Sequence, residues 1–502
     1  MKQLFKMNKV LWLALLAPIM IVLSSFVLNT TNTNPTDDND TVETLNTSGV
    51  KINHIKDGEW TKDFPIVKFD DVTYNRKGRK GTNNIYGYNI PDSHKPKATK
   101  PYVFRWDKSD TKSNTWWPQG VSGNGNSDLG GNKRLIMNSW YSKKKHGARI
   151  TIMDMTNPAK IEYRHILLVE STDRKYDFNK LNMKASYQEK YNAYSKEGKY
   201  SPVFTHAGGV SWYKNFVYIA DTRTGIRVFD LNKIFKTEGK KGKKDNKKCG
   251  YINGKYHAFN YGYAIPQVAV YHIKGASSFA CISLENVNGR RKLWTANFKS
   301  RVPGDGLTSI GKRFKTLDPI KQAKNVKAMH DMFLMPKDKS KHLYTHVYGY
   351  DLNEDGTVKT DPATVEGYLY KYAKISNAVS KAGAKLTTGD TKLDINSVNG
   401  VYREGNKVWL SRNMAPHHKK STCRLVIQEG KAPARMWRYP HTSEDLYYEK
   451  DTDILWSCTE APSGHAFVWL ALDAKDLLKN TKNIGKKPSN RIMFGVKRSS
   501  YK

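Results

Sequence analysis

Apolar and polar residues alternate over short runs between His206 and Asp230, a stretch that reads HAGGVSWYKNFVYIADTRTGIRVFD. Three strand-like runs separated by tight turns occur in it: Gly209–Tyr213, Phe216–Ala220 and Ile226–Asp230. Three antiparallel strands joined in this way form a meander. A meander that recurs along a chain is the unit of a β-propeller, so this stretch predicts one blade of such a ring.

The same order of an apolar strand, a turn and a Trp- or Tyr-containing strand returns along the chain. We therefore expect an all-β protein with a β-propeller over residues 101–502. Six blades are expected, and counts of five or seven stay open because inserts blur the period. The expected blades are residues 116–170, 206–249, 277–298, 326–375, 395–428 and 443–472. Two further strands, Pro101–Trp106 and Asn490–Val496, are expected to close the ring.

A basic start followed by an apolar run marks residues 1–28 as a signal peptide or an N-terminal membrane anchor. Three lysines within the first nine residues precede Val10–Leu28, which is 19 residues long and carries no charge. Both alternatives predict a propeller outside the cytoplasm, either extracellular or anchored to a membrane. Residues 29–49 are expected to form a flexible polar tether and residues 50–100 an irregular wrapping arm. We expect a monomer.

The chain has four cysteines, Cys249, Cys281, Cys423 and Cys458. None belongs to a C-x-x-C pair, which argues against a zinc cluster. In an exported protein, disulfides 249–281 and 423–458 are the simplest of the three possible connectivities, because they join neighbours in sequence. Four buried free thiols are the alternative.

The formal net charge is +38, from 84 Lys and Arg against 46 Asp and Glu. Such an excess predicts attraction to polyanions such as a polysaccharide, a cell-wall polymer or nucleic acid bound without sequence specificity. A lysine-rich surface that serves only solubility is the alternative. The segment 236–248 holds seven lysines in 13 residues. Its candidate polyanion-binding residues are Lys240, Lys241, Lys243, Lys244, Lys247 and Lys248.

Polar residues stand just before or at the start of the expected first strands of the blades. In a propeller these positions converge at the mouth of the central channel. The candidates for a divalent cation site are Gln119, His206, His330, Asn399 and Glu444. Their oxygens and imidazoles suit Ca²⁺ or a similar ion, or else a polar binding pocket. His206 and Glu444 are also the candidate catalytic groups. The alternative is structural, since such side chains often hydrogen-bond the backbone or ordered water.

Two of these segments, Asn399–Leu410 and Glu444–Trp456, resemble six-bladed propellers of the gluconolactonase and paraoxonase type. That resemblance implies a Ca²⁺-like metal supporting lactone or ester hydrolysis. The chain departs from the pattern, because His206 and Gln119 stand where a carboxylate or Asn is expected. The segments WWPQG, HAGG and SEDL are similar to those of secreted bacterial propeller-like proteins without an assigned activity.

Two functions follow from these patterns. The first is an exported propeller that binds an anionic polymer or a cell-surface ligand. The second is a metal-assisted hydrolase or lyase that acts at the channel mouth on a lactone, an ester or a similar small substrate. The sequence leaves open whether the protein is an enzyme.

Overall fold

The protein is described by a computed structural model. It describes residues 41–74, 79–80, 102–144, 146–173, 198–222, 225–239, 248–299, 343–374, 392–412, 424–432, 434–440, 442–460 and 491–501. Nearly all regular structure in these ranges is β-strand, and the two α-helices among them are α2 (Phe69–Tyr74) and α3 (Lys108–Thr111). No helix in these ranges is long and apolar enough to span a membrane. The expected signal or anchor segment lies outside the described residues.

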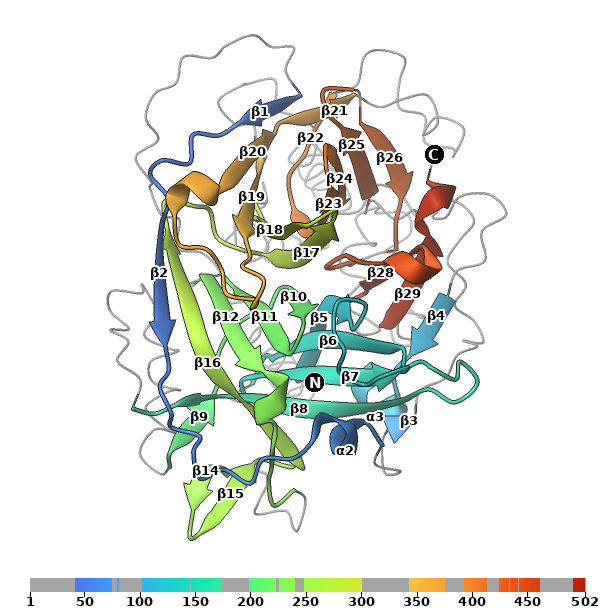
Figure 1. The fold of residues 1–502 in the computed structure, drawn as a ribbon. Coiled ribbons are helices and arrows are strands. Elements are labelled where there is room, and N and C mark those ends of the chain that lie inside the picture. The colour runs from blue at the N-terminus through green and yellow to red at the C-terminus, as the bar shows by residue number, and fades with distance from the viewer. Residues whose placement is uncertain are drawn as a thin grey trace, which may run out of the picture.

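The strands form five four-stranded antiparallel blades around a common axis, and the outer strands of blades 1 and 2 also pair with each other in parallel (Figure 1). Blade 1 contains β5 (Trp116–Gly123), β6 (Leu135–Ser142), β7 (Ala148–Asp154) and β8 (Glu162–Ser171). Blade 2 contains β10 (Val210–Tyr213), β11 (Phe216–Asp221), β12 (Gly225–Asp230) and β16 (Tyr263–Lys274). Blade 3 contains β17 (Cys281–Val287), β18 (Arg290–Ala296), β19 (Thr345–Asp351) and β20 (Glu366–Tyr370). Blade 4 contains β23 (Val398–Glu404), β24 (Lys407–Arg412), β25 (Arg424–Glu429) and β26 (Arg435–Arg438). Blade 5 contains β27 (Tyr447–Glu449), β28 (Ile454–Cys458), β29 (Ile492–Lys497) and β4 (Tyr102–Arg105).

The all-β propeller fold predicted from the sequence is confirmed, whereas the count of six blades is not. The segments 277–298 and 326–375 were expected to be separate blades. In the structure β18 pairs with β19, so that Lys292 lies opposite Asp351, and the two segments belong to one sheet. The described strands therefore form five blades.

Strand β4 closes the ring. It pairs with β29, so that Arg105 lies opposite Ile492, and an early strand completes the sheet of the last blade. This confirms the expected closure by the segments around residues 102 and 492.

The chain before β4 adds strands to the outside of three other blades. Strand β1 (Val42–Thr44) pairs with β20 of blade 3, and β2 (Lys51–Lys56) pairs with β16 of blade 2. Strand β3 (Arg79–Lys80) pairs with β8 of blade 1. The N-terminal segment therefore passes around the ring from blade 3 to blade 2, blade 1 and finally blade 5. Strand β1 falls in the stretch that was expected to be a tether.

Five hydrophobic clusters lie between neighbouring blades, and each draws residues from two sheets. The second strand of every blade contributes one large buried aromatic side chain: Trp140, Tyr218, Trp294, Trp409 and Trp456. Burying a large apolar side chain contributes about 1.5–3 kcal/mol. The aromatic residues that recur in the sequence are thus the residues that pack one blade against the next.

Smaller elements lie at the edges of the ring. They are β9 (Tyr200–Pro202), β13 (Phe235–Lys236), β14 (Cys249–Ile252), β15 (Lys255–Ala258), β21 (Tyr372–Lys374), β22 (Lys392–Asp394) and the 3-10 turns η2 (Leu231–Lys233), η5 (Pro362–Thr364), η7 (Lys450–Thr452) and η9 (Arg498–Ser500).

The predicted disulfide between Cys249 and Cys281 is wrong. Both are buried free thiols, as is Cys458. Cys249 packs in a cluster beneath the β14–β15 hairpin, whereas Cys281 packs between blades 3 and 4 at the start of an inner strand. Closeness in sequence does not bring them together, because between them the chain forms β16, the outer strand of blade 2, and then enters the inner strand of blade 3. Cys423 lies outside the described residues, and the predicted 423–458 bond is not formed by the free Cys458.

Candidate functional site

The ring mouth is the face at which the first strand of each blade begins and the second strand ends. Two of the predicted channel residues, Gln119 and Asn399, lie at this level in β-bulges of the first strands β5 and β23. Glu444 lies just before β27, and His206 lies just before β10. The four positions thus lie in or just before the first strands of their blades, and their role in a metal site or in catalysis stays a prediction.

At this level of the ring, the backbones of neighbouring blades lie very close to one another. A Cβ atom on Gly209 of blade 2 would lie 2.2 Å from the backbone nitrogen of Ile282 in blade 3. A Cβ atom on Gly400 of blade 4 would lie 2.6 Å from the carbonyl oxygen of Glu444 next to blade 5. Neighbouring blades therefore approach each other more closely than any larger residue would allow.

The carboxyl of Asp445 occupies this crowded centre. Its Oδ2 accepts a hydrogen bond from the Val210 N–H at 3.1 Å, and the N–H groups of Leu446, Val121 and Ile282 also interact with it. Burial raises the pKa of this carboxyl well above its usual range, and the N–H groups act in the opposite direction. These donors come from blades 2, 5, 1 and 3, so Asp445 acts as a hub that joins four blades.

The predicted channel residues make separate contacts around this hub. The Gln119 side chain donates to the carbonyl of Pro118 at 2.9 Å, and the His206 ring stacks against Tyr141 with centroids 4.2 Å apart. Glu444 donates its backbone N–H to Cys458 O at 2.9 Å. The described part of the chain contains no group of three His, Cys, Asp or Glu residues placed to hold a metal ion. His330 lies outside the described residues, and the calcium site stays a prediction.

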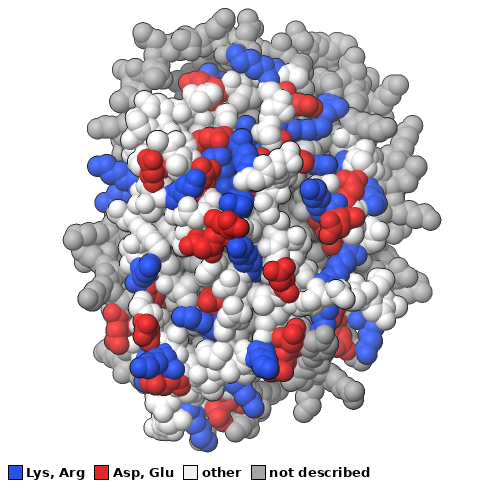
Figure 2. Space-filling view, viewed as in Figure 1, with Lys and Arg blue, Asp and Glu red and all other residues white. Residues whose placement is uncertain are grey.

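Of the six lysines predicted to bind polyanions, only Lys248 lies within the described residues, next to β14. On the face drawn in Figure 2, basic and acidic side chains of the described residues are interspersed rather than gathered by sign. Among the described residues, ion pairs such as Arg134–Glu449 and Lys371–Glu43 neutralise some of the cations. The net charge therefore does not translate into one basic patch on that face.

A pocket of about 520 Å³ opens beside blade 1. This volume lies within the range of about 300–1,000 Å³ that is usual for small-molecule sites. Its aromatic lining comes from Trp116 at the start of β5 and from Phe259 and Tyr261, which precede β16. Its polar lining includes Arg149 of β7 and His146 of the β6–β7 turn. The rings of Trp116 and Tyr261 stand nearly perpendicular, with centroids 6.1 Å apart.

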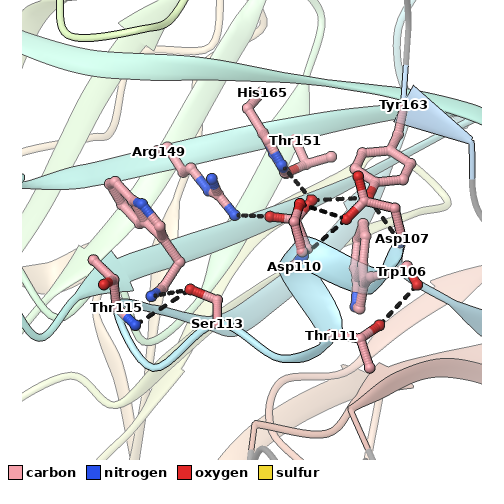
Figure 3. A network of polar contacts seen from close by, with 12 residues as sticks. Trp106, Asp107, Asp110, Thr111, Ser113, Thr115, Arg149, Thr151, Tyr163 and His165 are labelled. Atoms are coloured by element: carbon pink, nitrogen blue, oxygen red, sulfur yellow. Dashed lines mark hydrogen bonds and ion pairs between the residues drawn. The ribbon is translucent and has the colours of Figure 1, made fainter. Parts of the chain in front are cut away.

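A buried polar network forms one wall of the pocket (Figure 3). Arg149 Nη2 donates to Asp110 Oδ1 at 2.9 Å, and Tyr163 OH donates to Asp110 Oδ2 at 2.8 Å. His165 Nε2 contacts the same Oδ2 at 2.9 Å. Both carboxylate oxygens of Asp110 are thus engaged, and this residue of α3 is held against strands β7 and β8. Desolvation raises the pKa of Tyr163 far above its usual range, and the nearby Asp110 acts in the same direction.

Within this network, Thr151, His165 and Asp110 have the order of a hydroxyl–imidazole–carboxylate triad. Thr151 Oγ1 lies 2.6 Å from His165 Nδ1, and His165 Nε2 faces Asp110. The Thr151 side chain is fully buried in the blade and does not line the pocket. A nucleophile must reach its substrate, so this triad is a structural support in the described conformation.

Two nitrogens at the pocket wall are buried and have no hydrogen-bond partner among the described residues: Arg149 Nε and His146 Nδ1. The Arg149 guanidinium stacks over Trp116 at 4.5 Å, and its Nη1 donates to Tyr261 OH at 3.0 Å. Desolvation lowers the pKa of His146, and the nearby Lys144 lowers it further. The wall therefore combines aromatic faces, one buried guanidinium and unmet polar nitrogens.

Sequence reasoning did not identify this pocket. Trp116 belongs to the WWPQG segment that was noted as a blade start, but Asp110, Arg149, His165 and Tyr261 come from four separate elements. No motif connects them, because only the packing of α3 and of the segment before β16 onto blade 1 brings them together. The one available signal in the sequence was a single arginine, Arg149, within a largely apolar strand-like run.

Comparison with known proteins gives distant likeness only. No protein-family profile and no curated protein match the chain. Among solved structures, it is similar to the RS223 β-xylosidase, with 10% identity and a TM-score of 0.32 over 79% of this chain and 94% of that one. It is also similar to a GH43 β-xylosidase/α-arabinofuranosidase from a compost microbial metagenome, with 8% identity and a TM-score of 0.29 over 80% and 93% of the two chains.

A levansucrase of B. megaterium is a third similar structure, with 8% identity and a TM-score of 0.29 over 82% of this chain and 92% of that one. The resemblance to the gluconolactonase and paraoxonase type stays a prediction. Similarity this distant assigns neither a substrate nor an activity to the present chain.

Proposed function

We propose that this protein binds an anionic polysaccharide and that the pocket beside blade 1 takes one acidic sugar unit. The observation that carries the proposal is the wall itself, in which Trp116 and Tyr261 stand next to the buried Arg149. Aromatic side chains offer flat apolar faces with polar edges, which match the C–H face of a pyranose ring. A guanidinium pairs with a carboxylate through parallel N–H donors.

The charges at the pocket favour an acidic sugar over a neutral one. Among the described residues that line the pocket, the one carboxylate is that of Asp110, and both of its oxygens are engaged by Arg149, His165 and Tyr163. Arg164 adds a second guanidinium to the lining, and desolvation lowers its pKa. A ligand carboxylate next to Arg164 would offset that desolvation.

The net charge of +38 acts at longer range. It attracts a polyanion toward the molecule and speeds encounter, without fixing where the ligand binds. The pocket would then determine where and in which orientation the sugar unit binds. This division of roles agrees with the interspersed charges of Figure 2, where no described basic patch stands ready to serve as the binding surface.

Calorimetric titration of uronic acid oligomers and matched neutral oligomers into the purified protein tests the proposal. We expect binding of the acidic series, weaker at high salt, and a loss of at least tenfold in affinity in Trp116→Ala, about 1.4 kcal/mol. Trp437→Ala is the matched control, since Trp437 is a half-buried tryptophan of blade 4 away from the pocket. Equal binding of acidic and neutral oligomers, or unchanged affinity in Trp116→Ala, would contradict the proposal.

A further inference from the structure

A second polar group lies at the ring mouth next to the pocket. This mouth cluster consists of Trp117, Tyr141, Lys143, Glu460 and Arg491. Tyr141 OH donates to Glu460 Oε1 at 3.0 Å, and Arg491 Nε donates to the carbonyl oxygen of Glu460 at 3.1 Å. Lys143 Nζ lies 2.9 Å from the centre of the Trp117 ring, and the Arg491 guanidinium lies 5.7 Å from it. Two cations thus share one aromatic ring.

The mouth cluster and the pocket have a common wall. Arg491 Nη1 donates to the carbonyl oxygens of Asp110 at 2.7 Å and Ser113 at 2.9 Å, and both residues line the pocket. Trp116 and Trp117 are consecutive in β5, where neighbouring side chains point to opposite sides. Trp116 therefore belongs to the pocket and Trp117 to the mouth cluster, and the two sites meet at the backbone of Asp110 and Ser113 that Arg491 binds.

Lys143 is a half-buried cation without an ion pair among the described residues. The charged groups that face it are Glu460 and Arg491. Desolvation lowers the pKa of Lys143 to about 8, with Glu460 raising it and Arg491 lowering it. Burial also raises the pKa of Glu460, so this carboxyl is a weak counter-ion. The cluster carries more positive charge than the described chain neutralises.

We propose that the mouth cluster is a second saccharide subsite, in which Lys143 binds the acid group of the sugar unit adjoining the one in the pocket. The inference rests on the proposed function of the pocket and adds that the ligand is a chain with acid groups on consecutive units. Lys143 is then the residue that distinguishes such a chain from a single acidic sugar. Trp117 is only 6% exposed and has Lys143 over its ring, so it positions the amine and does not itself contact the sugar.

The test compares a uronic acid monomer with its trimer, titrated into the wild-type protein, Lys143→Met and Lys143→Arg. We expect the wild type to bind the trimer at least tenfold more tightly than the monomer. Lys143→Met should bring the trimer to within about threefold of the monomer, since Met keeps the contact with Trp117 but carries no charge. Thermal unfolding of each variant checks that the ring is intact.

The pH dependence separates a charge role from a packing role. The wild-type preference for the trimer should fall as the pH rises through about 8, because the amine loses its proton there. In Lys143→Arg the preference should persist at pH 9.5, because a guanidinium stays protonated. If Lys143→Met retains the full preference while Trp116→Ala loses binding, the second subsite is rejected and the pocket stands. If neither variant changes binding, the proposed function itself is rejected.

Discussion

At the centre of the ring, Asp445 connects the first strands of different blades through its side chain instead of through strand pairing. Its carboxyl lies among backbone N–H groups of Val210, Val121 and Ile282, and the residue itself is fully buried. Buried N–H groups that lose their acceptor cost about 1–3 kcal/mol each. The first strands of the blades therefore depend on one side chain for part of their hydrogen bonding.

Replacing this carboxyl should weaken the whole ring. We expect Asp445→Ala to lower the free energy of unfolding by at least about 3 kcal/mol, since it leaves several buried donors unpaired. Denaturant unfolding followed by tryptophan fluorescence measures the change. Asp451→Ala, at an exposed position of the same blade, should change the stability by less than about 0.5 kcal/mol. Equal stability of the two variants would show that Asp445 has no hub role.

At the scale of single residues, the sequence predicted the segment that reaches the centre of the ring but not the residue within it. From the SEDL segment we predicted Glu444 as the functional residue, whereas in the structure the neighbouring Asp445 contacts the N–H donors of the other blades. Successive side chains in an extended segment point to opposite sides, so an error of one residue exchanges the two roles. Cysteine spacing failed for a related reason, because it contains no information on which side of a blade each thiol lies.

The blades illustrate how far an element can be predicted from its pattern. A large aromatic residue in each second strand marks the repeat in the sequence, and in the structure these residues fill the space between sheets. The sequence pattern gave a wrong blade boundary where β18 and β19 pair, because the long connection 297–344 separates them in the chain. An insert of this length between the second and third strands looks like a boundary between two blades, and only the register of the pairing shows that it is internal.

Close packing between inner strands sets a strict limit on residue size at Gly209. A methyl group there would lie within 2.7 Å of backbone atoms of Cys281 and Ile282, which cannot rotate away. We expect Gly209→Ala to cost about 1–3 kcal/mol as overpacking. Gly49→Ala is the matched control, because nothing lies within 4 Å of its Cβ position. A Gly209→Ala protein with the melting temperature of the control would mean that the blades can separate without cost.

On the scale of the whole molecule, the ring depends on the pairing of β4 with β29. Phe104 of β4 is 1% exposed and packs between blades 5 and 1, whereas Tyr102 of the same strand is 42% exposed. We expect Phe104→Ala to lower the stability by about 3–5 kcal/mol, with a smaller loss in Tyr102→Ala. Calorimetry should show one earlier transition for Phe104→Ala. A separate low-temperature transition confined to blade 5 would instead show that the ring does not unfold as a unit.

The candidate pocket belongs to this scale as well. Its described residues come from α3, from three strands of blade 1 and from the connection before β16. Each of them looks unremarkable in its own segment, and the chemistry arises only when the outer segments pack on the ring. Fold class could be derived from local alternation, but this site depends on contacts between distant parts of the chain.

The path of the N-terminal segment has a consequence for the timing of synthesis. Val42 finds its partner only when Tyr370 has been made, and Arg105 must wait for Ile492. The strands β1 and β4 therefore wait for partners that are made much later, and until then their backbone N–H and C=O groups stay unpaired. A chain truncated a few residues before β29 could not pair β4 and could not close the ring. Such a truncated protein would therefore be an open, incompletely folded molecule.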